Sequence, residues 1–192
     1  MHIREFIEKY YPEYYSWNSY PADRTIPFCS THDEWGISSN FAQTPVTVDG
    51  VNFYSTESLF QVMKFTDAEA RKTVYSIKGQ GLKMKAKHFE KSAGVRADWG
   101  EIIVDVLKFC LMTKYAQSEA FRNELSRSGD RFIVEDQSTF SKPADTYGAK
   151  LSKDGVTYDG PNLMGRLLME LRDNGKLDYK LPEGILDFKD IK

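Results

Sequence analysis

The chain has 192 residues, of which 41% are hydrophobic and 28% are charged, a composition typical of a globular protein large enough to bury a core. Its 26 basic and 28 acidic side chains nearly cancel, which excludes an overall field that would hold the protein on nucleic acid or an anionic membrane. Any contact with nucleic acid must therefore be local.

The two cysteines, Cys29 and Cys110, form no CxxC pattern and are accompanied by three histidines, which argues against a zinc site. The first residues, MHIREFIEKY, carry charges where a signal peptide needs an apolar run. The sequence also lacks a stretch of about 18 apolar residues that would span a bilayer. We therefore expect a cytoplasmic protein with reduced thiols and no membrane partner.

The N-terminal half predicts helix first and strand later. Residues 3–10 place apolar side chains at helical spacing until Pro12 interrupts them, and a short strand is expected at residues 28–30. The segment PVTVDGVNFY predicts two short strands around Asp49 and Gly50, a pair that tolerates the positive φ angles of a tight hairpin turn.

Helices are expected to follow the hairpin. One is capped by Ser55 or Thr56 and runs through ESLFQVMKF into DAEARKTVYSI. After the basic segment KMKAKHFEKSAGVR, Asp98 is expected to cap a long helix that begins at Trp99 and ends near Ala116.

The C-terminal half predicts a helix at residues 118–127 that ends at Gly129, then the strand RFIVE and a long polar loop. A last helix begins at DGPNLMG, with Pro161 suited to its first turn. The fold class predicted is α+β, a mainly helical single domain with a small antiparallel sheet.

One helix face carries candidate chemistry, because Glu57, Gln61 and Lys64 fall at i, i+4 and i+7 and so form one strip opposite an apolar arc. The simpler interpretation is a solvated face with a weak Glu and Lys pairing. The functional interpretation is an acid, an amide and an amine aligned for catalysis.

Two further groups are ambiguous in the same way. The backbone N–H groups of Asn162 and Leu163, in GPNLMG, lie at a helix start and suit a phosphate, although any helix entry uses such residues. Trp99, with Asn40-Phe41 and Tyr147, offers aromatic faces for stacking a base, although an indole is usually core.

The motifs SSNFAQTPVTVDG, STESLFQVMKF, RADWGE, KYAQ, SGDRFIVE and GPNLMGRLLMELR occur in an order that resembles the NADAR family, also called YbiA-like. The resemblance implies a NADAR-like domain at residues 27–176, with an N-terminal extension at 1–26 and a C-terminal tail at 177–192. It further implies an N-glycosidase. Some members cleave the ribosylamine bond of early riboflavin-pathway intermediates, and others remove ADP-ribose from guanine in nucleic acid.

The resemblance makes Glu57 and Lys64 the catalytic pair. Glu57 would stabilise an oxocarbenium-like transition state or deliver water, and a neutral Lys64 amine would displace the base as a Schiff base. This mechanism requires no cofactor and no metal. The sequence departs from the family where Ser58 replaces a histidine and where Tyr147-Gly148 replaces a Trp-Gly pair.

The remaining expected site residues bind the substrate. The N–H groups of the GPNLMG segment, with Arg96, would hold the phosphate, and Trp99 and Tyr147 would sandwich the base. Asn40 and Gln61 would bind ribose hydroxyls. The full substrate-binding set expected is Asn40, Phe41, Gln61, Arg96, Trp99, Asp145, Tyr147, Asn162 and Leu163.

Two alternatives stay open. The basic run from Lys78 to Lys91 suits ADP-ribosylated nucleic acid as the substrate, or is simply a solvated helix face. A non-catalytic module that binds ADP-ribose or a nucleotide is the other alternative, although a pure binder would not need both Glu57 and Lys64.

Overall fold

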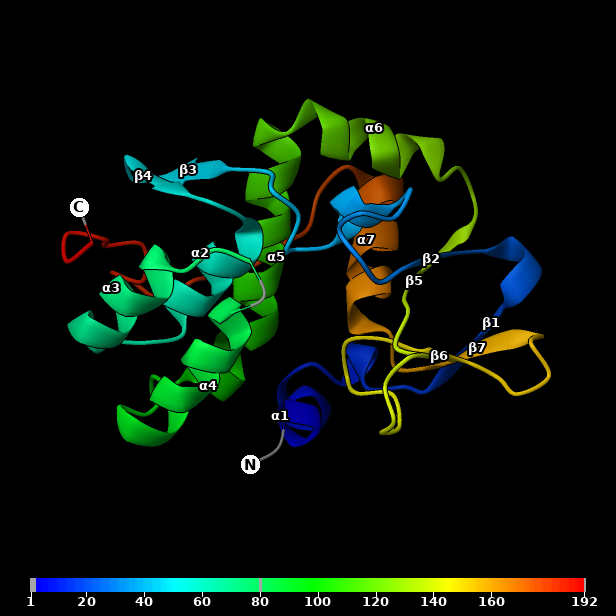
Figure 1. Ribbon diagram of the computed structural model, residues 1–192, viewed down its shortest axis with the longest axis horizontal. Helices are drawn as coiled ribbons and strands as arrows, with labels where there is room; N and C mark the ends of the chain where they lie inside the picture. The colour runs from blue at the N-terminus through cyan, green and yellow to red at the C-terminus, as the bar shows by residue number, and fades with distance from the viewer. Residues whose placement is uncertain (1–2, 80, 192) are drawn as a thin grey trace. The chain divides into compact units, whose positions relative to one another are not determined.

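The computed structural model describes residues 3–79 and 81–191 and confirms the predicted α+β fold, in which helices predominate (Figure 1). The α-helices in these residues are α1 (Ile3–Tyr10), α2 (Thr56–Met63), α3 (Ala68–Ser76), α4 (Gly81–Ser92), α5 (Trp99–Gln117), α6 (Glu119–Arg127) and α7 (Leu163–Asn174). The strands are β1 (Asn18–Pro21), β2 (Thr25–Phe28), β3 (Val46–Val48), β4 (Val51–Phe53), β5 (Phe132–Glu135), β6 (Lys150–Leu151) and β7 (Thr157–Gly160). Short 3-10 helices occupy Pro12–Tyr14, Ala22–Arg24 and Gly36–Ser38.

The chain forms two compact units, which are described separately. Unit 1 comprises Met1–Ser39 and Glu119–Leu177, and unit 2 comprises Asn40–Ser118 and Asp178–Lys192. Each unit is therefore built from segments that lie far apart in the sequence.

Unit 1 contains an antiparallel sheet in the order β1-β7-β6, in which Tyr20 lies opposite Tyr158. These two tyrosines pack with Val134 and Ala149 in a buried cluster. The predicted small antiparallel sheet is confirmed, and strands β2 and β5 add a separate parallel pair that the sequence did not predict. Parallel strands need a long crossover, and here most of unit 2 lies between the two strands in the sequence.

The segment expected to be a long loop after β5 contains a β-hairpin instead. Strands β6 and β7 pair antiparallel, and Gly155 takes a positive φ of 75° in the turn between them. The sequence pattern did not predict this hairpin because its strands are short and polar. In addition, β7 pairs with β1, which lies some 140 positions earlier in the chain. Residues 1–26 supply that partner strand.

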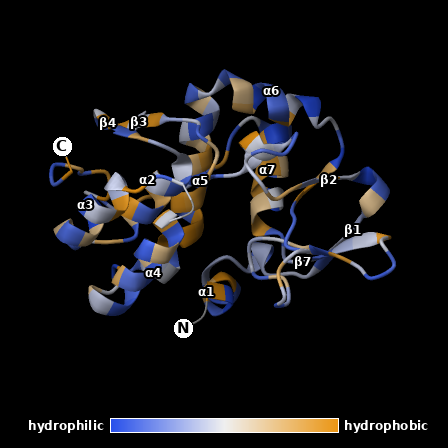
Figure 2. Ribbon diagram, in the orientation of Figure 1, coloured by the Kyte–Doolittle hydropathy of each residue, from blue (hydrophilic) through white to orange (hydrophobic). Residues whose placement is uncertain are grey.

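Unit 2 is organised around α5, which contacts α2 and β3, and α2 in turn packs on α3. Figure 2 shows hydrophobic residues along α5 and hydrophilic residues on the outer turns of α3 and α4. Among the helices of the described residues, α5 included, none combines the length and the apolarity that a membrane span requires. The predicted hairpin is confirmed, with positive φ angles of 48° at Asp49 and 75° at Gly50.

Two helices replace the single run expected after the hairpin. Helix α2 ends at Met63, and α3 begins afresh after Asp67, whose side chain accepts a hydrogen bond from the Ala70 N–H at 2.8 Å. An aspartate at this position satisfies one of the free N–H groups at a helix start, so it favours a new helix over a continued one.

The C-terminal residues complete the core of unit 2. Phe188 is fully buried and its ring packs edge-on against Phe53 at 5.1 Å between centroids. Arg71 on α3 pairs with Asp190 at 3.0 Å and donates to the Asp187 carbonyl oxygen at 2.7 Å. The residues expected to be a tail without pattern therefore pack by tertiary contacts.

Candidate active site

Helix α2 is buried along its whole length. The Ser55 side chain caps it by accepting a hydrogen bond from the Ser58 N–H at 3.3 Å, as the sequence predicted. All eight residues from Thr56 to Met63 are buried, including the polar strip. The interpretation of that strip as a solvated face was wrong, because neighbouring helices cover both the apolar and the polar side of α2.

Glu57 and Gln61 form a buried hydrogen-bonded pair on α2. Gln61 Nε2 donates a hydrogen bond to Glu57 Oε1 at 2.8 Å, and Glu57 is only 8% exposed. The Glu57 N–H donates to the Asn40 carbonyl oxygen at 2.9 Å, which fixes the first turn of the helix. Gln61 Oε1 is buried and has no hydrogen-bond partner among the described residues, so its capacity to accept a hydrogen bond is unused.

Burial raises the pKa of the Glu57 carboxyl above its ordinary value of 4.5. The hydrogen bond from Gln61 and the positive charges of Lys83 and Lys64 act in the opposite direction. Glu57 is therefore a carboxyl that keeps its proton to higher pH than an exposed glutamate does. Such a group suits acid or base catalysis.

Lys64 follows directly after α2 and is mostly covered, with 13% of its side chain exposed. Its Nζ pairs with Glu90 Oε1 at 2.5 Å and lies 5.9 Å from the centre of the Trp99 ring. The lysine is thus held between a carboxylate on α4 and an aromatic ring on α5.

Arg96 lies close to Lys64 because its N–H donates to the Lys64 carbonyl oxygen at 3.1 Å. Its guanidinium forms a bidentate ion pair with Asp98: Nε donates to Oδ1 at 2.5 Å and Nη2 donates to Oδ2 at 2.9 Å. Asp98 makes no side-chain cap on α5, so that expectation was wrong. The guanidinium beside it lowers the pKa of Asp98 and engages the carboxylate that a cap would need.

The aromatic residues expected in unit 2 differ in exposure. Trp99 is 5% exposed, and its ring meets Phe60 edge-on at 5.2 Å between centroids, as a core indole does. Phe41 is half-buried beside Asn40. The Asn40 side chain accepts a hydrogen bond from Thr56 Oγ1 at 3.1 Å, which ties it to the start of α2. Base stacking on Trp99 stays a prediction.

Unit 1 gathers the other four expected residues around the start of α7. Asp145 Oδ1 accepts from Gln137 Nε2 at 2.6 Å and from the Tyr147 N–H at 2.9 Å, which fixes the loop. The Leu163 N–H then donates to the Thr146 carbonyl oxygen at 3.1 Å. The substrate contacts expected of Asp145 and Tyr147 stay predictions.

The phosphate site expected at GPNLMG is corrected by the structure. The N–H groups of Asn162 and Leu163 donate to the carbonyl oxygens of Gly148 and Thr146 at 3.0 and 3.1 Å, so neither is available to an anion. Asn162 takes a positive φ of 51° just before α7, which begins at Leu163 rather than at Pro161.

The Asn162 side chain is instead a connector between α7 and β5. Its Nδ2 donates to the Ile133 carbonyl oxygen at 2.8 Å and its Oδ1 accepts from the Glu135 N–H at 3.1 Å. Gly165 permits this close approach, because a Cβ there would collide with the same Ile133 carbonyl oxygen. The motif is therefore explained by packing within unit 1.

Two charged residues near the α2 strip were not expected as site residues. Glu90 forms an ion pair with Lys64. The positive charge of Lys83 lowers the pKa of Glu57 more than that of Lys64 does. Both belong to α4, which the sequence marked only as a basic segment. The spacing of Lys83 and Glu90 on α4 gave no sign of which charges would face α2, since that depends on how the two helices pack.

Comparison with known proteins gives consistent matches. The NADAR domain model matches residues 24–174. N-glycosidase YbiA of Escherichia coli is 30% identical over 151 residues, which cover 79% of this chain and 88% of that protein. Its solved NMR structure matches with a TM-score of 0.61 at 29% identity, covering 79% of this chain and 84% of that one. A riboflavin biosynthesis protein of Vibrio vulnificus is 26% identical over 168 residues, which span 88% of this chain and 42% of that protein.

The α+β fold shared with the solved YbiA structure, together with 30% identity to N-glycosidase YbiA, defines the class of this protein as an N-glycosidase. The chain belongs to the NADAR domain family. The predicted family and enzyme class are thus confirmed.

Proposed function

We propose that this N-glycosidase hydrolyses the bond between C1 of a phosphorylated ribose and the nitrogen of a base, releasing ribose 5-phosphate. The observation that carries the proposal is the buried Glu57 and Gln61 pair on α2, with the Gln61 carbonyl oxygen left without a partner in the described residues. The names of the relatives, an N-glycosidase and a riboflavin biosynthesis protein, support a riboflavin intermediate as the substrate type.

Glu57 is the group proposed to act at C1. Breaking the C1–N bond builds positive charge on the ribose ring, and a carboxylate nearby stabilises that charge or takes a proton from the attacking water. Burial makes such an interaction stronger than it would be in water. Gln61 holds one carboxylate oxygen in place and offers its own oxygen to a ribose hydroxyl.

Lys64 is proposed to act covalently on the ring-opened form of the substrate. A neutral Nζ forms a bond to C1 while the bond to the base breaks, and the departing nitrogen takes a proton. Water then hydrolyses the resulting imine and returns the amine. Glu90, which holds Nζ at 2.5 Å, is placed to take the ammonium proton first.

The hydrolase proposal is tested by measuring ribose 5-phosphate release from a ribosylaminopyrimidine phosphate by the wild-type chain and by Glu57→Gln. We expect release by the wild type and a loss of about a thousandfold in the variant. Unchanged release by a folded Glu57→Gln protein would show that Glu57 does not act at C1.

The covalent step has its own test, which is borohydride trapping followed by peptide mass measurement. We expect a reduced sugar adduct on Lys64, absent from Lys64→Met and present in the matched control Lys83→Met. An adduct on Lys83, or an unmodified protein under turnover, would remove Lys64 from the covalent role and leave the role of Glu57 standing.

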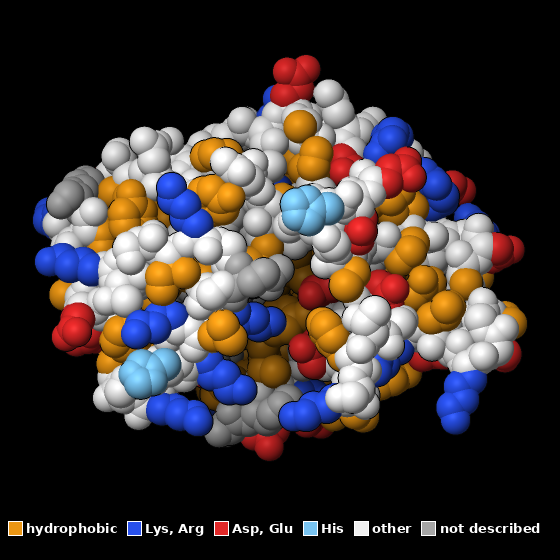
Figure 3. Space-filling view, viewed as in Figure 1, with side chains coloured by type: hydrophobic (Ala, Val, Ile, Leu, Met, Phe, Trp, Pro, Cys, Tyr) orange, Lys and Arg blue, Asp and Glu red, His pale blue; other side chains and the backbone are white. Residues whose placement is uncertain are grey.

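A second candidate substrate is ADP-ribosylated guanine in nucleic acid, which a basic face of α4 favours. The exposed lysines of this face are Lys83, Lys85, Lys87 and Lys91, and residue 80 of the basic run lies outside the described residues. Figure 3 shows Lys and Arg side chains gathered over the region where Figure 1 places α4. Such a face attracts phosphates locally although the total charge is near zero.

The two substrates are separated by assaying the ribosylaminopyrimidine phosphate and an ADP-ribosylated oligonucleotide side by side. A nucleic-acid substrate should lose turnover steeply as salt rises, and paired substitution of Lys85 and Lys87 by Gln should reduce it further. Turnover of the small riboside should be insensitive to both changes.

A further inference from the structure

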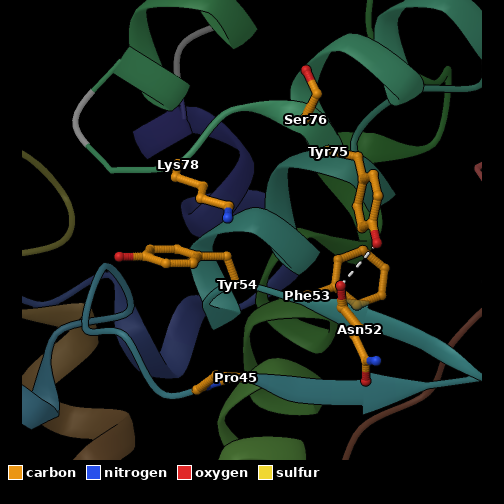
Figure 4. A pocket seen from close by; sticks show the side chains of 7 residues that line it. All are labelled: Pro45, Asn52, Phe53, Tyr54, Tyr75, Ser76 and Lys78. Atoms are coloured by element: carbon orange, nitrogen blue, oxygen red, sulfur yellow. Dashed lines mark hydrogen bonds between the residues drawn. The ribbon is translucent and has the colours of Figure 1, made fainter.

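Unit 2 contains a cavity of about 300 Å³ beside the β3–β4 hairpin and the end of α3 (Figure 4). Its lining residues come from the position before β3, from β4 and the residue after it, and from the end of α3 and the segment that follows, and neither Glu57 nor Lys64 is among them. The volume lies at the lower end of the range for small-molecule sites, which is about 300 to 1,000 Å³.

Two tyrosines line the cavity, Tyr54 after β4 and Tyr75 near the end of α3, as Figure 4 shows. Tyr75 is fixed in place: its hydroxyl donates to the Asn52 carbonyl oxygen at 3.0 Å, and its ring meets the buried Phe53 edge-on at 5.6 Å. Tyr54 is half-buried. These contacts hold the Tyr75 side of the cavity in place, so the cavity presents ordered aromatic surface there.

A positive charge stands at the same cavity. Lys78 Nζ lies 5.6 Å from the centre of the Tyr54 ring, and Figure 4 shows its side chain reaching over that ring. In residues 3–79 and 81–191, no carboxylate forms an ion pair with Lys78. An exposed ammonium held over an aromatic face without a counter-ion is open to an anion.

A hydrogen-bond donor completes the set. The Asn52 side-chain oxygen accepts a hydrogen bond from Thr47 Oγ1 at 2.6 Å, which leaves the amide nitrogen with no partner among the described residues. An amide N–H₂ of this kind suits the carbonyl oxygens on the edge of a base.

We propose that this cavity is a second ligand site, separate from the Glu57 strip, for a nucleobase-sized aromatic ring that carries a negative charge. The tyrosine rings contact the face of the aromatic ring, the Asn52 amide donates to its edge, and Lys78 binds the anionic group. A pyrimidine nucleoside monophosphate has this combination of size, ring and charge, so uridine 5′-monophosphate is the probe.

The test is a titration of the Glu57→Gln protein, in which no turnover interferes, followed by amide chemical shifts and calorimetry. We expect uridine 5′-monophosphate to shift the amides of Asn52, Tyr54, Tyr75 and Lys78. Uridine, which has the ring without the charge, should bind about tenfold more weakly, since one ionic contact contributes roughly that factor. Ribose 5-phosphate, which has the charge without the ring, should leave these amides unshifted.

Substitution of two exposed lysines measures the contribution of the Lys78 charge to ligand binding. Lys78→Gln should lower the affinity for uridine 5′-monophosphate to that for uridine, whereas Lys72→Gln, on the outside of α3, should leave it unchanged. Equal affinity in the wild type and Lys78→Gln, or shifts confined to residues 57–64, would overturn the proposal. Because both lysines are exposed, neither variant depends on a change in folding, and a failure of the hydrolase assay would not alter either outcome.

Discussion

Gln61 donates a hydrogen bond from Nε2 to Glu57 Oε1 at 2.8 Å, one helical turn apart and buried, while its own carbonyl oxygen stays without a partner in the described residues. A buried amide oxygen that lacks a partner costs free energy unless a ligand supplies the missing donor. The pair therefore orders a carboxylate and leaves an acceptor beside it, which is the arrangement that we propose receives a sugar hydroxyl.

Substitution of Gln61 tests this arrangement. Gln61→Met keeps the length of the side chain but removes both hydrogen bonds, and we expect kcat/KM to fall roughly 10- to 100-fold, the effect of losing a hydrogen bond to a charged group. Gln61→Glu should place a second carboxyl beside Glu57 and raise its pKa further, which moves the acid limb of the pH–rate profile to higher pH. A profile unchanged in Gln61→Glu would contradict a role for Glu57 as a base.

The stability of the fold should depend on pH through Glu57. Because burial raises its pKa in the folded state, the contribution of Glu57 to stability is fully present below pH 4.5 and is lost as pH rises through the raised value. Urea unfolding of the wild type and Glu57→Gln across this range should show the variant gaining relative stability as pH rises. The opposite slope would mean that Glu57 is stabilised in its charged form.

The pH–rate profile should show an acid limb that is also set by the raised pKa of Glu57. If the carboxylate form of Glu57 acts at C1, kcat/KM should fall as pH drops through the raised pKa of the free protein, so the midpoint of this limb lies above 4.5. Measurement of kcat/KM from pH 4 to 8 checks the position. A limb at or below 4.5 would assign it to an exposed carboxyl instead.

Glu90 should affect catalysis more than stability. The Glu90 side chain is 37% exposed, so Glu90→Gln should change the free energy of unfolding by less than about 1 kcal/mol. If Glu90 takes the Lys64 proton, the same variant should slow borohydride trapping on Lys64. Glu101→Gln, near the start of α5, is a matched exposed control and should leave trapping unchanged.

Asn162 should behave as a structural residue. Asn162→Leu removes hydrogen bonds to the Ile133 carbonyl oxygen and the Glu135 N–H, and should destabilise the protein by about 2 to 4 kcal/mol. Asn162→Asp keeps the acceptor but sets an oxygen against the Ile133 carbonyl oxygen, so it should also destabilise the protein. Asn174→Leu, exposed at the end of α7, is the control and should cost about 0.5 kcal/mol or less. A fully stable Asn162→Leu protein would contradict the connector role.

Local chemistry in the sequence predicted much of the fold. The Asp49-Gly50 turn, the Ser55 cap and the start of α5 at Trp99 all follow from interactions between residues close in the chain, and each is confirmed. The helical spacing of Glu57 and Gln61 likewise placed them on one strip, because an α-helix brings i and i+4 together regardless of its surroundings.

Tertiary packing decided what local spacing leaves open. The sequence alone determined that Glu57, Gln61 and Lys64 share a helix face and that their motifs are those of an N-glycosidase family. Only the tertiary structure decided that this face is buried, that Glu90 rather than solvent meets Lys64, and that the Asn162 and Leu163 N–H groups are used internally. The physical reason is that burial and partner choice depend on residues far apart in the chain, and periodicity within one element carries no information about which element covers it.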